Sequence, residues 1–134
     1  MSKQYKVDGR QITDLPSLCR EFAAAVQAPN GYFGHDLASF DDCLFGGYGL
    51  ETPCEVVWTD SEVSKRALSC EMLAAWCSDQ LDQRTYLDDE GRRWLLETKA
   101  RAQQGQRSMF DEVIHAITSM KERSGGSELR LVLA

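Results

Sequence analysis

Residues 29–44 read PNGYFGHDLASFDDCL, in which a PNG turn, an aromatic pair with a glycine, and an amphipathic segment follow one another. The turn residues are typical of the end of a preceding helix. The spacing of the apolar side chains after the glycine predicts another helix over about residues 35–45. A glycine-rich loop, FGGYGL at 45–50, comes next. The short helix is therefore bounded on both sides by loops that carry aromatic residues.

The expected helix has an apolar face and a polar face. With about 100° between successive residues, Leu37, Phe40 and Leu44 share the apolar side, and Cys43 lies at its margin. Asp42 lies on the opposite side of the helix. We therefore expect the apolar side to be buried and the carboxylate of Asp42 to stand at the centre of the exposed side.

The other residues of the exposed side are small or acidic. Ala38 and Ser39 lie to either side of Asp42, and Asp41 lies on the flank. Asp36 falls in the first turn, where a carboxylate interacts favourably with the helix dipole. A rigid acidic surface of this kind suits a cationic protein partner. The same pattern also fits an amphipathic helix that only covers a sheet, and the spacing alone leaves both interpretations open.

The segments around this helix alternate between strand patterns and helix patterns. Strands are expected at residues 5–9, 53–58 and 129–134, where apolar residues alternate with polar ones or β-branched residues are frequent. Other helices are expected from a cap at Thr13 or Asp14 to about residue 26, from Ser61, and over 109–122. Strands separated by helices predict a small parallel sheet in an α/β fold.

Residues 70–107 follow this pattern less closely. Their first part, CEMLAAWC (70–77), places Met72, Leu73, Trp76 and Cys77 near one helical face. Residues 85–94 have the composition of a turn, with a break at Gly91. Residues 99–107 are polar, and we expect a frayed helix or a linker there.

The composition describes one ordinary soluble domain of 134 residues with a net charge of −6. No apolar run approaches the roughly 20 residues of a membrane span, and the first ten residues lack the apolar core of a signal peptide. We therefore expect a cytoplasmic protein whose five cysteines are reduced, with no membrane partner. The negative charge argues against a nucleic-acid partner.

The negative charge is concentrated in one part of the chain. Residues 21–64 contain eight acidic residues and neither lysine nor arginine. A field of one sign accelerates association with an oppositely charged partner. A solvated acidic face is the alternative explanation for such a run.

Catalytic and metal sites have little support in the sequence. Cys43 with His35 or His115 is conceivable as a thiol–imidazole pair. Cys43, however, lies on the apolar side of its helix, where thiols are inert. His115 lies in an apolar helix, where a structural role is more common. The FGGYGL loop lacks the lysine of a phosphate-binding loop, and no metal-ligand spacing occurs. We expect no enzyme activity, no cofactor and no metal.

Several motifs together resemble the barstar family, the intracellular inhibitors of a secreted bacterial ribonuclease. The resemblance is carried by VDGRQI (7–12), PNGYFGHDLASFDDCL (29–44), PCEVVW (53–58), SEVSKRAL (61–68) and LRLVLA (129–134). It covers about residues 5–68 and 109–134. Residues 70–107 lie outside it, which predicts a single barstar-like domain over 1–134 with a helical insertion at 70–107.

The resemblance implies a three-stranded parallel sheet flanked by helices, and a second helix that plugs a nuclease active site. It places Asp42 in the enzyme's phosphate-binding pocket and Tyr32 against its catalytic histidine, with Asp36 and Gly46 as further contacts. The sequence departs from the family at Ala38, where an acid is usual, and at Asp41, where an exposed tryptophan is usual. The family also has an acidic residue on a later helix. In this sequence Ser119 lies near that position, and Glu122 lies one turn away. The expected partner-binding residues are Tyr32, Phe33, Asp36, Ala38, Ser39, Asp41, Asp42, Phe45, Gly46 and Tyr48.

The expected function is that of a bacterial antitoxin or immunity protein, a monomer or weak dimer that blocks a toxin with a basic active site, with a ribonuclease as the preferred target. The alternative is a regulatory adaptor, or an immunity protein for a toxin of another kind, that binds through residues 70–107. In that case Trp76, Tyr86 and Trp94 are the candidate anchors. Packing of these aromatics within the insertion is the simpler interpretation.

Overall fold

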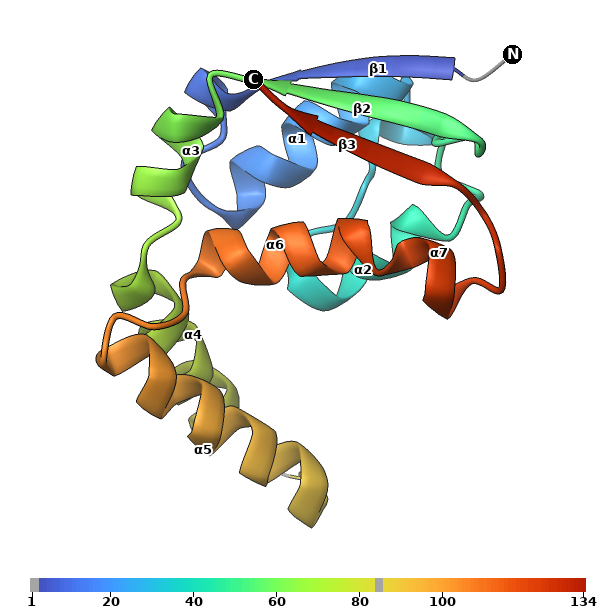
Figure 1. Ribbon diagram of the computed structural model, residues 1–134. Coiled ribbons are helices and arrows are strands. Elements are labelled where there is room, and N and C mark those ends of the chain that lie inside the picture. The colour runs from blue at the N-terminus through green and yellow to red at the C-terminus, as the bar shows by residue number, and fades with distance from the viewer. Residues whose placement is uncertain (1–2, 84–85) are drawn as a thin grey trace. The chain divides into compact units, whose positions relative to one another are not determined.

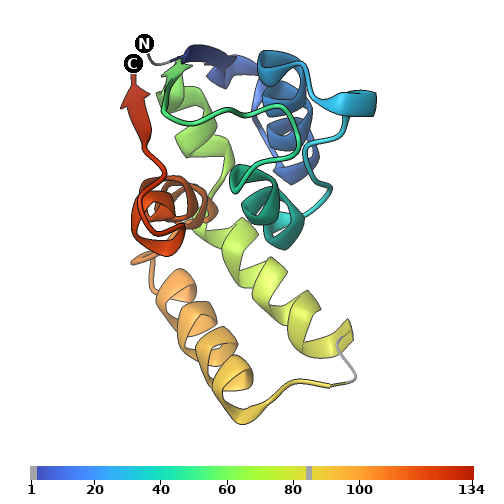
Figure 2. The same cartoon turned by 90° about the vertical axis from the view of Figure 1, so that its right-hand side faces the viewer.

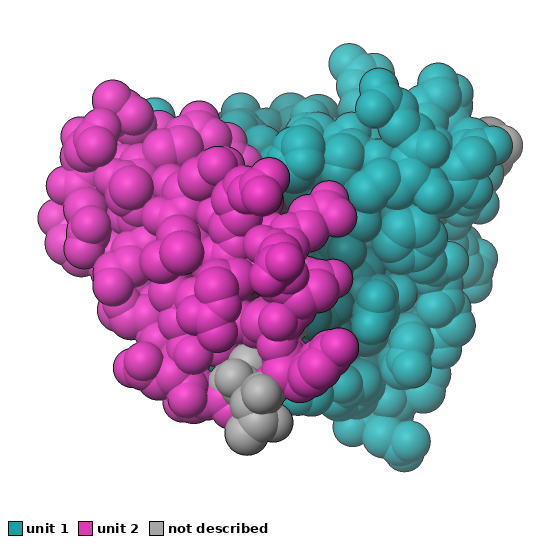
Figure 3. All heavy atoms as spheres, turned by 90° about the horizontal axis from the view of Figure 1, so that it is seen from below, with its two compact units in different colours: residues 1–67, 113–134 teal, residues 68–112 magenta. Residues whose placement is uncertain are grey.

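The computed structural model describes residues 3–83 and 86–134 (Figure 1). The chain forms two compact units, one of residues 1–67 and 113–134 and one of residues 68–112 (Figure 3). Each unit is described by itself below. Among the described residues, no helix has the length and apolar character needed to cross a bilayer.

The first unit contains a parallel sheet of three strands in the order β1-β2-β3. The strands are β1 (Lys3–Asp8), β2 (Cys54–Thr59) and β3 (Leu129–Leu133). Tyr5 pairs with Val56, which pairs with Leu131 on the other side. Because β2 lies in the centre, both of its edges are hydrogen-bonded. The expected α/β fold with a three-stranded parallel sheet is confirmed.

The helices of this unit lie on one face of the sheet (Figures 1 and 2). They are α1 (Leu15–Val26), α2 (Leu37–Leu44), α3 (Ser61–Ala67), the end of α6 (Met109–Thr118), and α7 (Met120–Arg123). Two single-turn 3₁₀ helices span Gly9–Gln11 and Pro29–Gly31. Of the two expected caps, Thr13 and Asp14, the structure uses Asp14, which accepts a hydrogen bond from the Ser17 amide.

Aromatic side chains fill the space between the sheet and the helices. Phe22 of α1 lies at the centre, with ring-centroid distances of 4.9 Å to Phe40, 5.6 Å to Phe33 and 6.3 Å to Trp58. All four side chains are fully buried. The indole N–H of Trp58 donates to the hydroxyl of Ser64, so its polar atom is satisfied inside the core. This cluster fixes α2 against α1 and thereby positions the exposed side of α2.

On the opposite face of the sheet, no helix from the described residues of this unit is present (Figure 1). Its side chains include Gln4, which is hydrogen-bonded to Glu55 across the β1–β2 pair. Arg130 of β3 lies 3.8 Å from the same Glu55 carboxylate. These cross-strand pairs allow a parallel sheet to remain partly exposed, although such sheets are usually covered on both faces.

The second unit contains an antiparallel pair of helices, α4 (Cys70–Gln83) and α5 (Asp89–Gln103). Its buried side chains include Leu73 and Cys77 of α4 and Leu95 of α5. Within the pair, the rings of Trp76 and Trp94 meet edge to face at 6.3 Å.

The prediction of a turn over residues 85–94 is wrong for most of its length, because the helix α5 begins at Asp89 and includes the rest of this segment. Thr85 lies outside the described residues. Asp88 caps the helix by accepting a hydrogen bond of 2.7 Å from the Gly91 amide. A Cβ on Gly91 would lie 2.9 Å from the same carboxylate, so glycine permits this close cap. The glycine therefore marks a helix start and not a break.

The helix expected over 109–122 is divided into α6 and α7 at Ser119. The hydroxyl of Thr118 donates to the carbonyl of Ile114, four residues earlier. Such a bond competes with the helix ladder and bends helices. From α7, the side chain of Arg123 reaches Asp41 near the end of α2.

Candidate protein-binding site

The start of α2 is fixed by a reciprocal cap. The carboxylate of Asp36 accepts a 2.8 Å hydrogen bond from the amide of Ser39, and the hydroxyl of Ser39 accepts one of 3.1 Å from the amide of Asp36. Asp36 is thus the N-cap and lies just before the first turn. Both of these predicted partner-binding residues are half-buried and engaged in holding the helix.

The loop before α2 depends on a glycine and a buried ring. Gly34 has φ +99°, and a Cβ there would lie 2.7 Å from the backbone nitrogen of Phe40. Phe33, next to it, is 1% exposed. Its ring packs on Phe22 and Phe40 inside the fold, and the expectation that Phe33 contacts a partner stays a prediction. Its neighbour Tyr32 is the ring that reaches the surface.

The two carboxylates at the end of α2 have different surroundings. Asp41 receives two hydrogen bonds from Arg123, of 2.6 Å and 2.7 Å, and its side chain is 29% exposed. Asp42 is exposed, and its carboxylate has no hydrogen bond or ion pair with any residue of 3–83 or 86–134. The flank position of Asp41 on the helical wheel leads to an internal ion pair, whereas the outward position of Asp42 leads to solvent.

Asp42 belongs to an exposed stripe along α2. Ala38, Asp42 and Phe45 are spaced four and three residues apart, so they share one side of the helix, and all three are exposed. Phe45 is the C-cap of α2 and is 46% exposed. The predicted exposure of Ala38 and Asp42 is confirmed, while their role in binding stays a prediction.

Two further aromatic rings lie on the loops that flank α2. Tyr32 and Tyr48 are each 38% exposed, and their ring centroids are 5.7 Å apart. The hydroxyl of Tyr32 lies 3.2 Å from Nδ1 of His35. The contact between the rings joins the loop before α2 to the loop after it. Together with Phe45 they provide rigid apolar area around an acidic helix.

The loop after α2 turns through consecutive glycines. Gly46 and Gly47 have φ of +118° and +87°, a region that residues with a Cβ rarely adopt. Gly46 is half-buried, and its amide donates to the carbonyl of Cys43. Glycine at these positions lets the backbone reverse its direction directly after α2, and this turn brings Tyr48 beside Tyr32.

Arg123 of α7 is the residue of this surface that sequence reasoning missed. It lies 82 positions from Asp41 and carries no motif, so only the fold brings the two together. Its guanidinium lies 5.2 Å from the centroid of the Phe45 ring. The hydroxyl of Ser119 accepts a hydrogen bond from it, and Glu122 is exposed one turn away.

The thiols have the environment of core residues. Burial raises the pKa of Cys43, and it raises the pKa of Cys19 to about 12. A thiol at neutral pH is a poor nucleophile. His115 is exposed on α6, and its expected structural role stays a prediction. Within residues 3–83 and 86–134, no group of three or more histidine, cysteine or acidic side chains is arranged to hold a metal ion.

Comparison with known families matches most of the chain to one described family. The family described as Barstar (barnase inhibitor) matches residues 2–108, a span that includes the sheet strands β1 and β2, all of α2, and the α4–α5 pair. Comparison with curated proteins finds none that matches. The matched span covers most of the 134 residues, and the fold has the three-stranded parallel sheet and flanking helices expected of that family. The chain belongs to the barstar family.

Proposed function

We propose that this protein is an antitoxin or immunity protein that inhibits a cognate ribonuclease by inserting the exposed side of α2 into its active site. The family to which the chain belongs is described by its inhibition of barnase. The observation that carries the proposal is the carboxylate of Asp42, which is exposed on a helix that is capped at one end and packed on a fully buried aromatic core.

The chemistry of the proposed target explains why a carboxylate inhibits it. An enzyme that cleaves a phosphodiester surrounds the scissile phosphate with cationic groups. A carboxylate at the same place accepts charge-assisted hydrogen bonds, which are bidentate when the donor is arginine. Burying an unpaired carboxylate is costly, but the cationic site supplies the missing partners. Asp42 is suited to this because no side chain among the described residues competes for its carboxylate.

The aromatic rings of the surface contribute in another way. Tyrosine and phenylalanine supply large contact area with few rotatable bonds, so little entropy is lost on binding. Tyr32 and Tyr48 already hold each other at 5.7 Å, which reduces that loss further. We propose that Tyr32, Phe45 and Tyr48 pack on the walls of the cleft while Asp42 occupies its phosphate pocket.

The direct test begins with the genes that flank this one, and it uses any exported ribonuclease that they encode. That protein is purified and its cleavage of RNA is measured at several RNA concentrations, with and without the inhibitor. We expect inhibition that more RNA substrate relieves, because both ligands would occupy one cleft. Binding without any effect on RNA cleavage, or inhibition independent of RNA concentration, contradicts the proposal.

We also predict that association slows steeply with added salt. Residues 21–64 carry acidic side chains and no basic ones, so their field attracts a cationic cleft at long range, and salt screens that field over about 10 Å at 0.1 M. Stopped-flow measurement of the association rate between about 0.02 and 0.5 M NaCl checks this. A rate constant that stays level across this range would show that the acidic segment serves solvation and not steering.

A further inference from the structure

We infer that Arg123 is a positioning residue, which clamps the end of α2 and thereby holds Asp42 in place for the partner. The effect of Arg123 on partner binding rests on the proposed function. The contact between Arg123 and α2 can be tested in the free protein, without any partner. Arg123 lies on the short helix α7 and does not belong to the sequence motif that carries α2.

The geometry of the clamp uses nearly every donor of the guanidinium. Nη1 and Nη2 donate to the two carboxylate oxygens of Asp41 at 2.7 Å and 2.6 Å. Nη2 also donates to the carbonyl of Ala116 at 2.7 Å, and Nε donates to the hydroxyl of Ser119 at 2.9 Å. One side chain therefore ties α2 to both α6 and α7. Such planar, bidentate bonding is specific to arginine, because lysine presents a single point charge.

The helix α2 needs an anchor of this kind. It has only eight residues, and helices this short are marginal without tertiary contacts. Its first turn is fixed by Asp36, but its last turn contains no basic residue to interact with the negative end of the helix dipole. Arg123 supplies that positive charge from another helix, next to Asp41.

The clamp also determines which acid is presented to a partner. Asp41 and Asp42 are neighbours, but the pairing with Arg123 neutralises Asp41, whereas Asp42 has no partner within residues 3–83 and 86–134. The guanidinium further lies over the Phe45 ring, so it orients a second residue of the exposed stripe. Arg123 thus fixes one carboxylate and one aromatic ring on either side of the residue proposed to enter the phosphate pocket.

The partner-independent test measures amide hydrogen exchange of residues 38–45 in the free protein. We expect exchange about tenfold faster in Arg123→Gln and in Asp41→Asn, within the range of coupling found for directly paired side chains. The double variant should exchange no faster than either single variant, because each removes the same pair. Arg123→Lys should resemble Arg123→Gln, since its ammonium cannot replace the planar set of donors.

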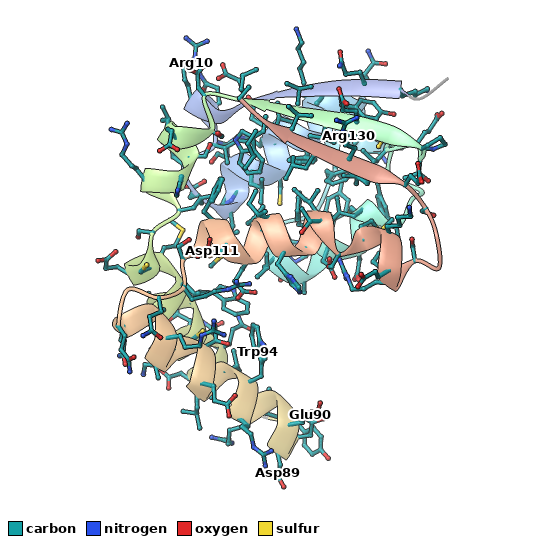
Figure 4. All side chains as sticks on the ribbon, viewed as in Figure 1. Arg10, Asp89, Glu90, Trp94, Asp111 and Arg130 are labelled. Atoms are coloured by element: carbon teal, nitrogen blue, oxygen red, sulfur yellow. The ribbon has the colours of Figure 1, made fainter. Side chains whose placement is uncertain are left out.

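The matched control is Arg10→Gln. Arg10 also pairs with carboxylates, those of Asp8 and Asp60, and lies by the carboxyl end of β1, away from α2 (Figure 4). Its loss should leave exchange in α2 unchanged. Exchange of residues 38–45 at the wild-type rate in Arg123→Gln, or an equal acceleration in Arg10→Gln, overturns the inference.

The second measurement is inhibition of the ribonuclease used in the direct test of the proposed function. We expect Arg123→Gln to weaken inhibition about tenfold, with a urea midpoint no lower than that of Arg10→Gln. Inhibition at wild-type strength, together with accelerated exchange, contradicts the positioning role. If the wild-type protein fails to inhibit, the proposed function is wrong, and the exchange experiment alone still decides whether Arg123 clamps α2.

Discussion

Replacing Asp42 by alanine should weaken binding of the ribonuclease by at least about 2 kcal/mol. This loss of binding free energy corresponds to a dissociation constant that is about 30-fold higher. The expectation follows from the surroundings of the carboxylate, which is exposed and has no partner within the described chain, so all of its pairing comes from the enzyme. A charged residue buried in an interface and fully paired is a typical binding hot spot. Isothermal titration with the purified enzyme measures the effect.

The control for this variant is Glu62→Ala. Glu62 is exposed at the start of α3 and belongs to the same acidic segment, but not to the surface of α2. The Glu62→Ala variant should change the association rate slightly and the dissociation rate hardly at all, since charges far from the interface act mainly on the rate at which the two proteins meet. Melting temperatures of Asp42→Ala and the wild type should agree. Equal effects of Asp42→Ala and Glu62→Ala would mean that the acids act only through the long-range field.

Replacing Gly34 by alanine should lower the free energy of unfolding by about 2–4 kcal/mol. The φ of +99° is unfavourable for alanine, and its Cβ would lie 2.7 Å from the backbone nitrogen and 2.9 Å from the Cα of Phe40. Neither atom can move without shifting α2 on the buried rings of Phe22 and Phe33. Urea denaturation measures the loss.

Gly31 provides a matched control in the same loop. Its φ is +65°, and a Cβ there would have no atom within 4 Å. Gly31→Ala should therefore cost only the conformational term, about 1 kcal/mol. If the two variants lose the same stability, the close approach of Gly34 to α2 has no energetic weight, and the loop is held by other contacts.

The regular elements of the sheet domain were predictable because their patterns are local. Alternating apolar residues give β1 and β2, and the apolar spacing of α1 and α2 gives their buried faces. The exposure of Asp42 follows from the same helical period, and the structure confirms it. The helix α5 was missed because Gly91 looks like a turn residue, whereas its amide serves the cap at Asp88.

The parts of the site that depend on long-range contact were not predictable. Nothing near Arg123 indicates that it pairs with Asp41, because the two residues lie 82 positions apart and only the fold brings α7 beside α2. Phe33 and Tyr32 are adjacent aromatics, and the sequence does not tell which ring is buried; the structure buries Phe33 against Phe22. Sequence patterns thus identify the helix, while the fold decides which of its side chains remain available.

The helical pair α4–α5 has no assigned role. The family match runs through it, from residue 2 to residue 108, so the expectation that residues 70–107 are an insertion stays a prediction. The same holds for the alternative in which this pair binds the partner through its exposed aromatic residues, among them Tyr86 and Trp94. Loss of inhibition in Trp94→Ala without loss in Asp42→Ala would favour that alternative.

A crystal structure of the complex with the ribonuclease tests the proposed mechanism most directly. We predict that α2 fills the active-site cleft, with the carboxylate oxygens of Asp42 within about 3 Å of the cationic side chains that bind the scissile phosphate. The Asp41–Arg123 pair should remain intact beside it. An enzyme bound to another face of the molecule, with the Asp42 carboxylate still surrounded by water, would contradict this account.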